Sequence, residues 1–257
     1  MIPHINPHIK WIALLLLALV AGGVHRQVLA AEIVVGAFSQ LEPSDGLPPH
    51  WEKMVFPNIK RQTEYRLVRD GSRTVIQADS DRSASGIIRH FKGSPRQYPW
   101  ISWQWKIDHV LKKGDVASRQ GDDYAARIYV AFAFSPNGLT WWQRMQYRAA
   151  NLAAGGKLPG SAINYIWANK APQGTVVGNA YTDRAKMIVL QSGDLRAGKW
   201  VFERRNIVED YRAAFGDRPP PIVGIAVMTD TDNTGESTTA YYSDIRLSDG
   251  RKDDDGQ

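Results

Sequence analysis

A stretch near the middle of the chain, WISWQWKID, alternates between apolar and polar side chains without exception. Successive side chains of a β-strand point to opposite faces of a sheet, so a period of two predicts a strand with one buried face. A helix cannot place these apolar residues on one side. They are Ile101, Trp103, Trp105 and Ile107. The chain must therefore build a sheet that covers this strand on one face.

The same alternation recurs elsewhere. Short runs rich in Val, Ile and aromatic residues follow one another closely, separated by turn residues such as Asp70 and Gly71. Roughly ten or more strands without a βαβ rhythm predict a mainly β protein, a β-sandwich of jelly-roll type with one or two short helices. The run AARIYVAFAF places one set of residues on the buried face, namely Ala126, Ile128, Val130, Phe132 and Phe134.

Two segments have helical spacing instead. Apolar residues recur every three or four positions in LTWWQRMQYRAANLAAGG, and two glycines follow. In NIVEDYRAAFG, Asn206 is a candidate N-cap with Glu209 three residues later, and Gly216 closes the segment. We expect a helix in each segment. The first could pack on a sheet or lie on a membrane surface, because Arg144 and Arg148 accompany its Trp and Met residues.

The beginning of the chain has the layout of a signal peptide, in which an apolar run follows Lys10 and small residues follow the run. We expect residues 1–31 to be removed, residues 32–248 to form a single β-sandwich domain, and residues 249–257 to be a disordered tail. An uncleaved anchor is the alternative. The sequence contains no cysteine, so the exported domain is held by its core and not by disulfides. The expected location is periplasmic or secreted, without a stable membrane span after cleavage.

The stretch MTDTDNTG concentrates oxygen-bearing side chains between two strand-like runs. Its residues Asp230, Asp232 and Asn233 resemble the start of an EF-hand calcium loop. Position twelve of that pattern falls on Tyr241 and not on an acid, which excludes an EF-hand. Because Asp, Asn and Gly are typical turn residues, the first interpretation is the tip of a β-hairpin. The second is a calcium site of another type that uses the same three side chains.

Adjacent carboxylates precede the strand of AARIYVAFAF. Asp122 and Asp123 could act as general acid and base if their surroundings separate their pKa values. The alternative is an ion pair between Asp123 and Arg127, which the spacing of a strand would place on one side.

A polar and aromatic group in SAINYIWAN resembles the side chains that bind sugars. The Trp167 ring could stack on a sugar and the Asn164 amide could bind hydroxyl groups. Trp103 and Trp105 are expected in the core, because they lie on the apolar side of their strand. Trp100 and Trp141 are further candidates for an exposed platform.

Several classes of function lack their motifs. The sequence has no G-x-S-x-G, H-E-x-x-H, P-loop or dinucleotide fingerprint. A net charge of +6 with no dense run of Lys and Arg gives no reason to expect a nucleic-acid partner.

Five motifs taken together resemble a bacterial exported family of unknown function, family 3047 of its series. They are WISWQWKID, GDDYAARIYVAFAF, INYIWAN, RNIVEDYRAAFG and IAVMTDTDNTGESTTAYYSDIRL, over about residues 33–247. The resemblance implies an exported single domain and supplies no established activity.

Three functions remain open at this point. The first is a non-catalytic protein that binds a glycan or another envelope component, with or without calcium. The second is a polysaccharide lyase or hydrolase that uses a pair of carboxylates. The third is a structural or partner-docking protein of the envelope, which an exposed apolar helix around Trp142 would favour. Neither the ligand nor the oligomeric state is specified by the sequence.

Overall fold

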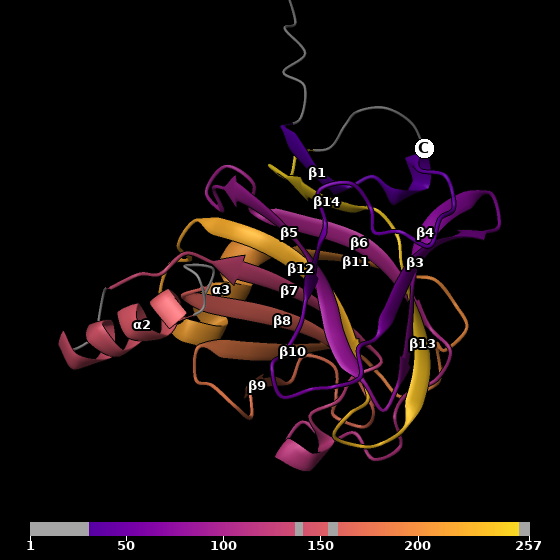
Figure 1. The fold of residues 1–257 in the computed structure, drawn as a ribbon. Coiled ribbons are helices and arrows are strands. Elements are labelled where there is room, and N and C mark those ends of the chain that lie inside the picture. The colour runs from indigo at the N-terminus through magenta and orange to yellow at the C-terminus, as the bar shows by residue number, and fades with distance from the viewer. Residues whose placement is uncertain (1–30, 137–140, 154–158, 252–257) are drawn as a thin grey trace, which may run out of the picture.

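The computed structural model describes residues 31–136, 141–153 and 159–251. Within them, two curved sheets of seven strands each form a β-sandwich of jelly-roll type with two α-helices (Figure 1). The predicted fold class is confirmed. The predicted signal peptide and most of the predicted tail lie outside the described residues.

Sheet A contains the stretch WISWQWKI as its strand β6. All of its strand pairs are antiparallel. Its strands in spatial order are β1 (Glu32–Gly36), β14 (Ile245–Ser248), β6 (Trp100–Ile107), β13 (Ser237–Tyr242), β4 (Arg73–Asp81) and β3 (Glu64–Asp70), with β11 (Val201–Asn206) also paired to β6.

Sheet B is antiparallel except for the pair β8 and β10, which is parallel. The run AARIYVAFAF supplies its strand β7. The strands in spatial order are β2 (Glu52–Met54), β5 (Ala84–Gly93), β12 (Ile222–Asp230), β7 (Ala126–Phe132), β8 (Ser161–Ala168), β10 (Ala185–Ser192) and β9 (Val176–Gly178).

The core lies between the sheets, and large aromatic side chains fill its centre. Trp103 and Trp105 are buried, as the alternation predicts. The Trp103 ring contacts Tyr165 of β8 with centroids 5.3 Å apart, and the Trp105 ring contacts Trp167 at 5.9 Å. Aromatic pairs at these separations add to the stabilisation from burial. This cluster fixes sheet B against sheet A.

Both predicted helical segments contain a helix. The N-cap of α3 is Asn206, whose Oδ1 accepts bonds from the N–H groups of Val208 and Glu209, and Gly216 follows with φ of 73°. In the described part of the chain, neither helix is long and apolar enough to cross a membrane. The helices are α2 (Trp141–Ala153) and α3 (Ile207–Phe215), and two 3₁₀ turns are η2 (Phe38–Gln40) and η3 (Arg119–Gly121).

The stretch MTDTDNTG is not the tip of a hairpin, so that interpretation is wrong. Strand β12 before it pairs with β5 and β7 in sheet B, whereas β13 after it pairs with β4 and β6 in sheet A. The stretch therefore crosses from one sheet to the other. Gly235 does turn the chain, with φ of 70°, and its N–H donates to the Thr231 carbonyl at 3.0 Å. Alternation along each strand cannot show which sheet the next strand joins.

A carboxylate lies near the rim of the core, on β11. Glu203 accepts a hydrogen bond from Gln191 at 2.6 Å, and burial raises its pKa despite this bond. The folded protein therefore holds the proton more tightly than the unfolded chain. The resulting stability is present at low pH and is lost as pH rises above about 4.5, the ordinary value for Glu.

We therefore expect Glu203→Gln to stabilise the protein at pH 7, with a gain that shrinks as pH falls toward 4. Urea unfolding at several pH values measures this difference. Glu64→Gln removes an exposed carboxylate and serves as control. A gain that does not change with pH would contradict the argument.

Candidate functional site

The face of sheet B that points away from sheet A carries the candidate site. Ile128 on β7 and Val227 on β12 belong to the core, so their neighbours Arg127 and Met228 project from the opposite face. Arg127 and Met228 are partners in the strand register. This face borders a pocket of about 580 Å³ that includes both side chains. The alternation of β7 thus places a guanidinium group in the pocket.

Arg127 is buried and its partners come from three segments. Its Nε donates to Asp230 Oδ1 at 2.7 Å and its Nη2 donates to Asp230 Oδ2. Nη2 also donates to the Asp122 carbonyl at 2.6 Å, and Nη1 donates to the Tyr129 hydroxyl at 3.2 Å. The guanidinium lies 4.3 Å from the ring centroid of Tyr124. The expected ion pair of Arg127 is therefore made with Asp230 and not with Asp123.

Asp123 instead organises the loop after β12. Its Oδ2 accepts the Thr234 N–H at 2.6 Å, and its Oδ1 accepts the Asn233 side-chain amide at 3.3 Å. The Asn233 amide oxygen points the other way and accepts the Tyr181 hydroxyl at 3.2 Å. The two bonds to Asp123 join residues that are 111 and 110 positions apart in the sequence. The loop of MTDTDNTG and the segment before β7 are thus fastened to each other.

Negative charge exceeds positive charge at the site. Asp122, Asp123 and Asp230 are buried and Asp232 is half-buried, and Arg127 is the cation among them. The Asp122 Oδ1 atom has no hydrogen-bond partner and lies 3.8 Å from the Arg127 Nη1. A surplus of buried carboxylates is unfavourable until a proton or a cation compensates it.

The pKa values of three of these carboxyl groups are raised. Burial raises the pKa of Asp122 and of Asp230, and the Arg127 guanidinium opposes the rise in both cases. Burial also raises the pKa of Asp232, and the charge of Asp123 adds to the rise. The site therefore favours a proton or a cation at these oxygens.

Three of these acids are close enough to share one cation. An oxygen from each of Asp123, Asp230 and Asp232 lies within 4.8 Å of the other two. Calcium binds oxygen ligands at about 2.3–2.6 Å, so oxygens at this spacing can surround one ion. Asn233 directs its NH₂ group toward Asp123, and therefore Asp123 fits the ligand set better than Asn233. The donor set consists of oxygens alone, which is the chemistry of calcium rather than of zinc.

The walls of the pocket come from loops. Tyr181, in the loop after β9, is 58% exposed, and its N–H donates to the Asn179 side chain. The Asn179 amide in turn lies 3.4 Å from Asp122 Oδ2. Apolar side chains of Phe56 and Ile59 line the pocket on the side of β2. The pocket therefore combines an exposed aromatic ring, amides, carboxylates and an apolar wall.

The two remaining predicted residues lie on β8, on opposite faces of sheet B. Trp167 is buried in the core, and its indole N–H donates to the Gly193 carbonyl at 3.1 Å. Asn164 is the register partner of Tyr129, so it lies on the same face as the pocket. Asn164 is buried, and both of its amide atoms lack a hydrogen-bond partner. Such an unpartnered buried amide is rare.

Sequence reasoning missed Tyr181, Asn179 and the apolar wall. None of them stands in a motif, because loops from three distant parts of the chain build the pocket. Asp122, Arg127, Asp230 and Asp232 were singled out because they lie at or next to the ends of two strand-like runs, AARIYVAFAF and PIVGIAVMT.

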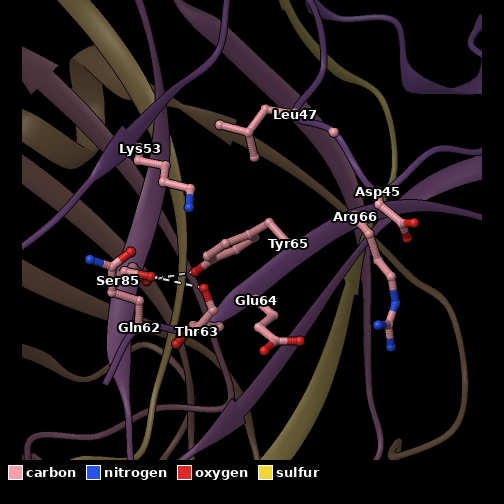
Figure 2. A pocket seen from close by; sticks show the side chains of 10 residues that line it. Asp45, Leu47, Lys53, Gln62, Thr63, Glu64, Tyr65, Arg66 and Ser85 are labelled. Carbon is pink, nitrogen blue, oxygen red and sulfur yellow. Dashed lines mark hydrogen bonds between the residues drawn. The ribbon is translucent and has the colours of Figure 1, made fainter. Parts of the chain in front are cut away.

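A second hollow of similar size lies beside β3 and β5, and Figure 2 shows its side chains. The hydroxyl groups at its centre already donate hydrogen bonds to backbone carbonyls of the protein. Tyr65 donates to the Ser85 carbonyl at 2.6 Å, and Ser85 donates to the Thr63 carbonyl at 3.0 Å. Its charged side chains have both signs, with Lys53 and Glu64 among them. The hollow lacks the unbalanced charge that marks the pocket on sheet B.

Fold and site together define a two-sheet β-sandwich with an acidic pocket on one outer face. The chain belongs to the family described as protein of unknown function DUF3047, whose model matches residues 49–246. The resemblance found in the sequence is thereby confirmed. No curated protein matches the chain.

The chain is also similar to several solved structures. A mutant of a carbohydrate-binding module of family 29 is 11% identical, with 88% of this chain and 97% of that chain covered and a TM-score of 0.37. A family 12 xyloglucanase from Bacillus licheniformis, in complex with ligand, is 8% identical, with 85% and 98% covered and a TM-score of 0.44. Endoglucanase 3 of family GH12 from Trichoderma harzianum is 9% identical, with 85% and 97% covered and a TM-score of 0.38.

Proposed function

We propose that the protein is an exported, non-catalytic glycan-binding protein whose ligand enters the pocket on sheet B. The observation that carries this proposal is the lining of the pocket. An exposed Tyr181 ring lines it together with the side chains of Asn179 and Asn233 and the apolar side chains of Phe56 and Ile59. A sugar presents both C–H faces and hydroxyl groups, which such a lining can contact together.

The charge of the pocket narrows the ligand class. Asp122 and Asp232 line it with Asp230, and Arg127 is the cation among the lining residues. An acidic glycan would add like charge to this surplus, whereas a neutral glycan can donate its hydroxyl hydrogens to the carboxylates. The proposed ligand is therefore a neutral glycan. The size of the pocket, about 580 Å³, lies in the range of small-molecule sites.

A calcium ion below the pocket is the second part of the proposal. Asp123, Asp230 and Asp232 would hold it, and Asp230 would keep its bonds to Arg127. The ion would compensate the carboxylates and fasten the loop of Asp232 and Asn233, which forms one rim of the pocket. Calcium would thus support the glycan site without taking part in a reaction.

Thermal unfolding with and without calcium tests whether the protein binds this ion. We expect calcium chloride to raise the Tm of the wild type, since a ligand at 100 times its Kd adds about 2.7 kcal/mol to the stability of the folded state. Asp232→Asn should abolish this response. It should also raise the Tm in chelator, because it removes one of the repelling carboxylates. Asp108→Asn, which removes an exposed acid elsewhere, is the control and should keep the full response.

A glycan array followed by calorimetry tests the ligand. We expect binding to a neutral glycan, and Tyr181→Ala should weaken it about tenfold or more because the ring is the main stacking surface. Phe202→Ala removes a comparably exposed ring, 61% exposed, from sheet A and should have no effect. Wild-type protein that binds no glycan, or that binds equally well without the Tyr181 ring, would refute the proposal.

An enzyme that uses paired carboxylates is the second candidate. It is favoured by one observation, the raised pKa values of Asp122 and Asp232 in a common pocket. Asp123 and Asp230 suit this chemistry less well, since Asp230 is paired with Arg127 and Asp123 holds the loop after β12. Incubation of any bound glycan with the protein distinguishes the candidates. Release of new sugar ends that stops in Asp122→Asn would assign an enzyme.

A further inference from the structure

The helix α2 exposes an apolar surface of its own. Trp141 and Trp142 are 70% and 62% exposed, Met145 is 39% exposed and Leu152 is 82% exposed. Figure 1 shows α2 outside the two sheet layers. Single exposed apolar residues are ordinary, but two neighbouring tryptophans grouped with two further apolar residues mark a surface that contacts something else.

The helix is oriented so that this surface points outward. At 100° per residue, these four side chains fall within about 100° of the helix circumference. Tyr147 lies on another side and is buried, with its ring stacked on Phe134 at 3.8 Å and 4.9 Å from the Arg184 guanidinium. Tyr147 therefore attaches α2 to the body, and the apolar face is the side left exposed.

The charged side chains of α2 indicate what kind of partner its apolar surface contacts. Arg144 and Arg148 of α2 are exposed, and the helix contains no acidic residue. On the helical wheel both arginines lie beside the apolar face, within about 60° of Trp141. A second copy of the same surface would bring arginines against arginines. A layer that is apolar inside and anionic at its surface satisfies both kinds of side chain.

We propose that α2 docks the protein on an anionic lipid surface, with the tryptophans at the depth of the headgroups and the arginines on lipid phosphates. Tryptophan concentrates at the boundary between water and lipid, and long basic side chains reach back to the headgroups. Short amphipathic helices bind membranes by the same division of apolar and basic faces. This contact is independent of the glycan site, because no residue of α2 lines that pocket.

Co-sedimentation with lipid vesicles tests the docking surface in the full chain. We expect the wild type to bind vesicles of phosphatidylcholine with about 30% phosphatidylglycerol. Trp141→Ser with Trp142→Ser should weaken this binding about tenfold or more. Arg144→Gln with Arg148→Gln should weaken binding to these vesicles about tenfold and have a much smaller effect with pure phosphatidylcholine. The apolar stretch at the start of the chain is the same in every variant and cannot cause a difference.

Leu195→Ser is the matched control, since Leu195 is an apolar side chain 89% exposed in a loop elsewhere. Circular dichroism and urea unfolding show whether each variant is folded. Binding that is absent in the wild type, or unchanged by both double substitutions, would overturn the proposal. Sedimentation velocity tests whether a second copy of the chain binds this surface instead. A dimer that forms only when Trp142 is present would assign the surface to a second copy. Glycan binding should persist in all α2 variants, so either function can fail alone.

Discussion

Replacing Arg127 with methionine should lower the free energy of unfolding by about 3–5 kcal/mol. The guanidinium is the cation in contact with the buried carboxylates of Asp230 and Asp122. Methionine keeps most of the apolar stem and removes the charge, which leaves the carboxylates buried without compensation. Urea unfolding measured by circular dichroism gives the difference.

A surface ion pair provides the comparison. Arg61 pairs with Asp81 while both side chains are about half exposed, so Arg61→Met should cost no more than about 1 kcal/mol. Replacing both members of the buried pair, as Arg127→Met with Asp230→Leu, should recover part of the loss, because no partner charge of that pair remains buried. If Arg127→Met and Arg61→Met lower the free energy of unfolding by the same amount, Arg127 is not the buried counter-charge described above.

Trp167→Ala is expected to have an effect of similar size, about 3–5 kcal/mol, for a different reason. The side chain is 1% exposed and packs against Trp105 between the sheets. Its removal leaves a cavity that the stiff sheets around it cannot close. Trp141→Ala removes the same type of ring at a position that is 70% exposed and should change stability by no more than about 0.5 kcal/mol.

A conservative substitution, Trp167→Phe, separates two roles for Trp167. If its ring contacts a glycan, the conservative Trp167→Phe should weaken binding while the protein remains folded. If its role is in the core, Trp167→Phe should lower the Tm and leave the affinity of the folded protein unchanged. We expect the second result.

The fold class was predictable because each strand and helix is specified by residues that are neighbours in the sequence. The alternation of WISWQWKID specifies both the strand and its buried face, and Trp103 and Trp105 lie where the pattern places them. Asn206 and Gly216 specify the ends of α3 in the same way. Pairing between sheets is not local, which is why the loop after Asp230 was mistaken for a hairpin.

The site was predictable in part for a related reason. Carboxylates at the ends of two strong strands are visible in the sequence, but their partners depend on which strands become neighbours. Arg127 meets Asp230 because β7 lies beside β12, a pairing between residues 103 positions apart. Tyr181 enters from a loop after β9 with no pattern of its own.

A crystal structure of the protein, grown with calcium and with the best neutral glycan from the array, would show whether both ligands bind at the pocket on sheet B. We expect sugar density between Tyr181 and Phe56, and an ion about 2.3–2.6 Å from oxygens of Asp230 and Asp232. Sugar bound in the hollow beside Tyr65, or on the outer face of sheet A near Phe202, would contradict this expectation.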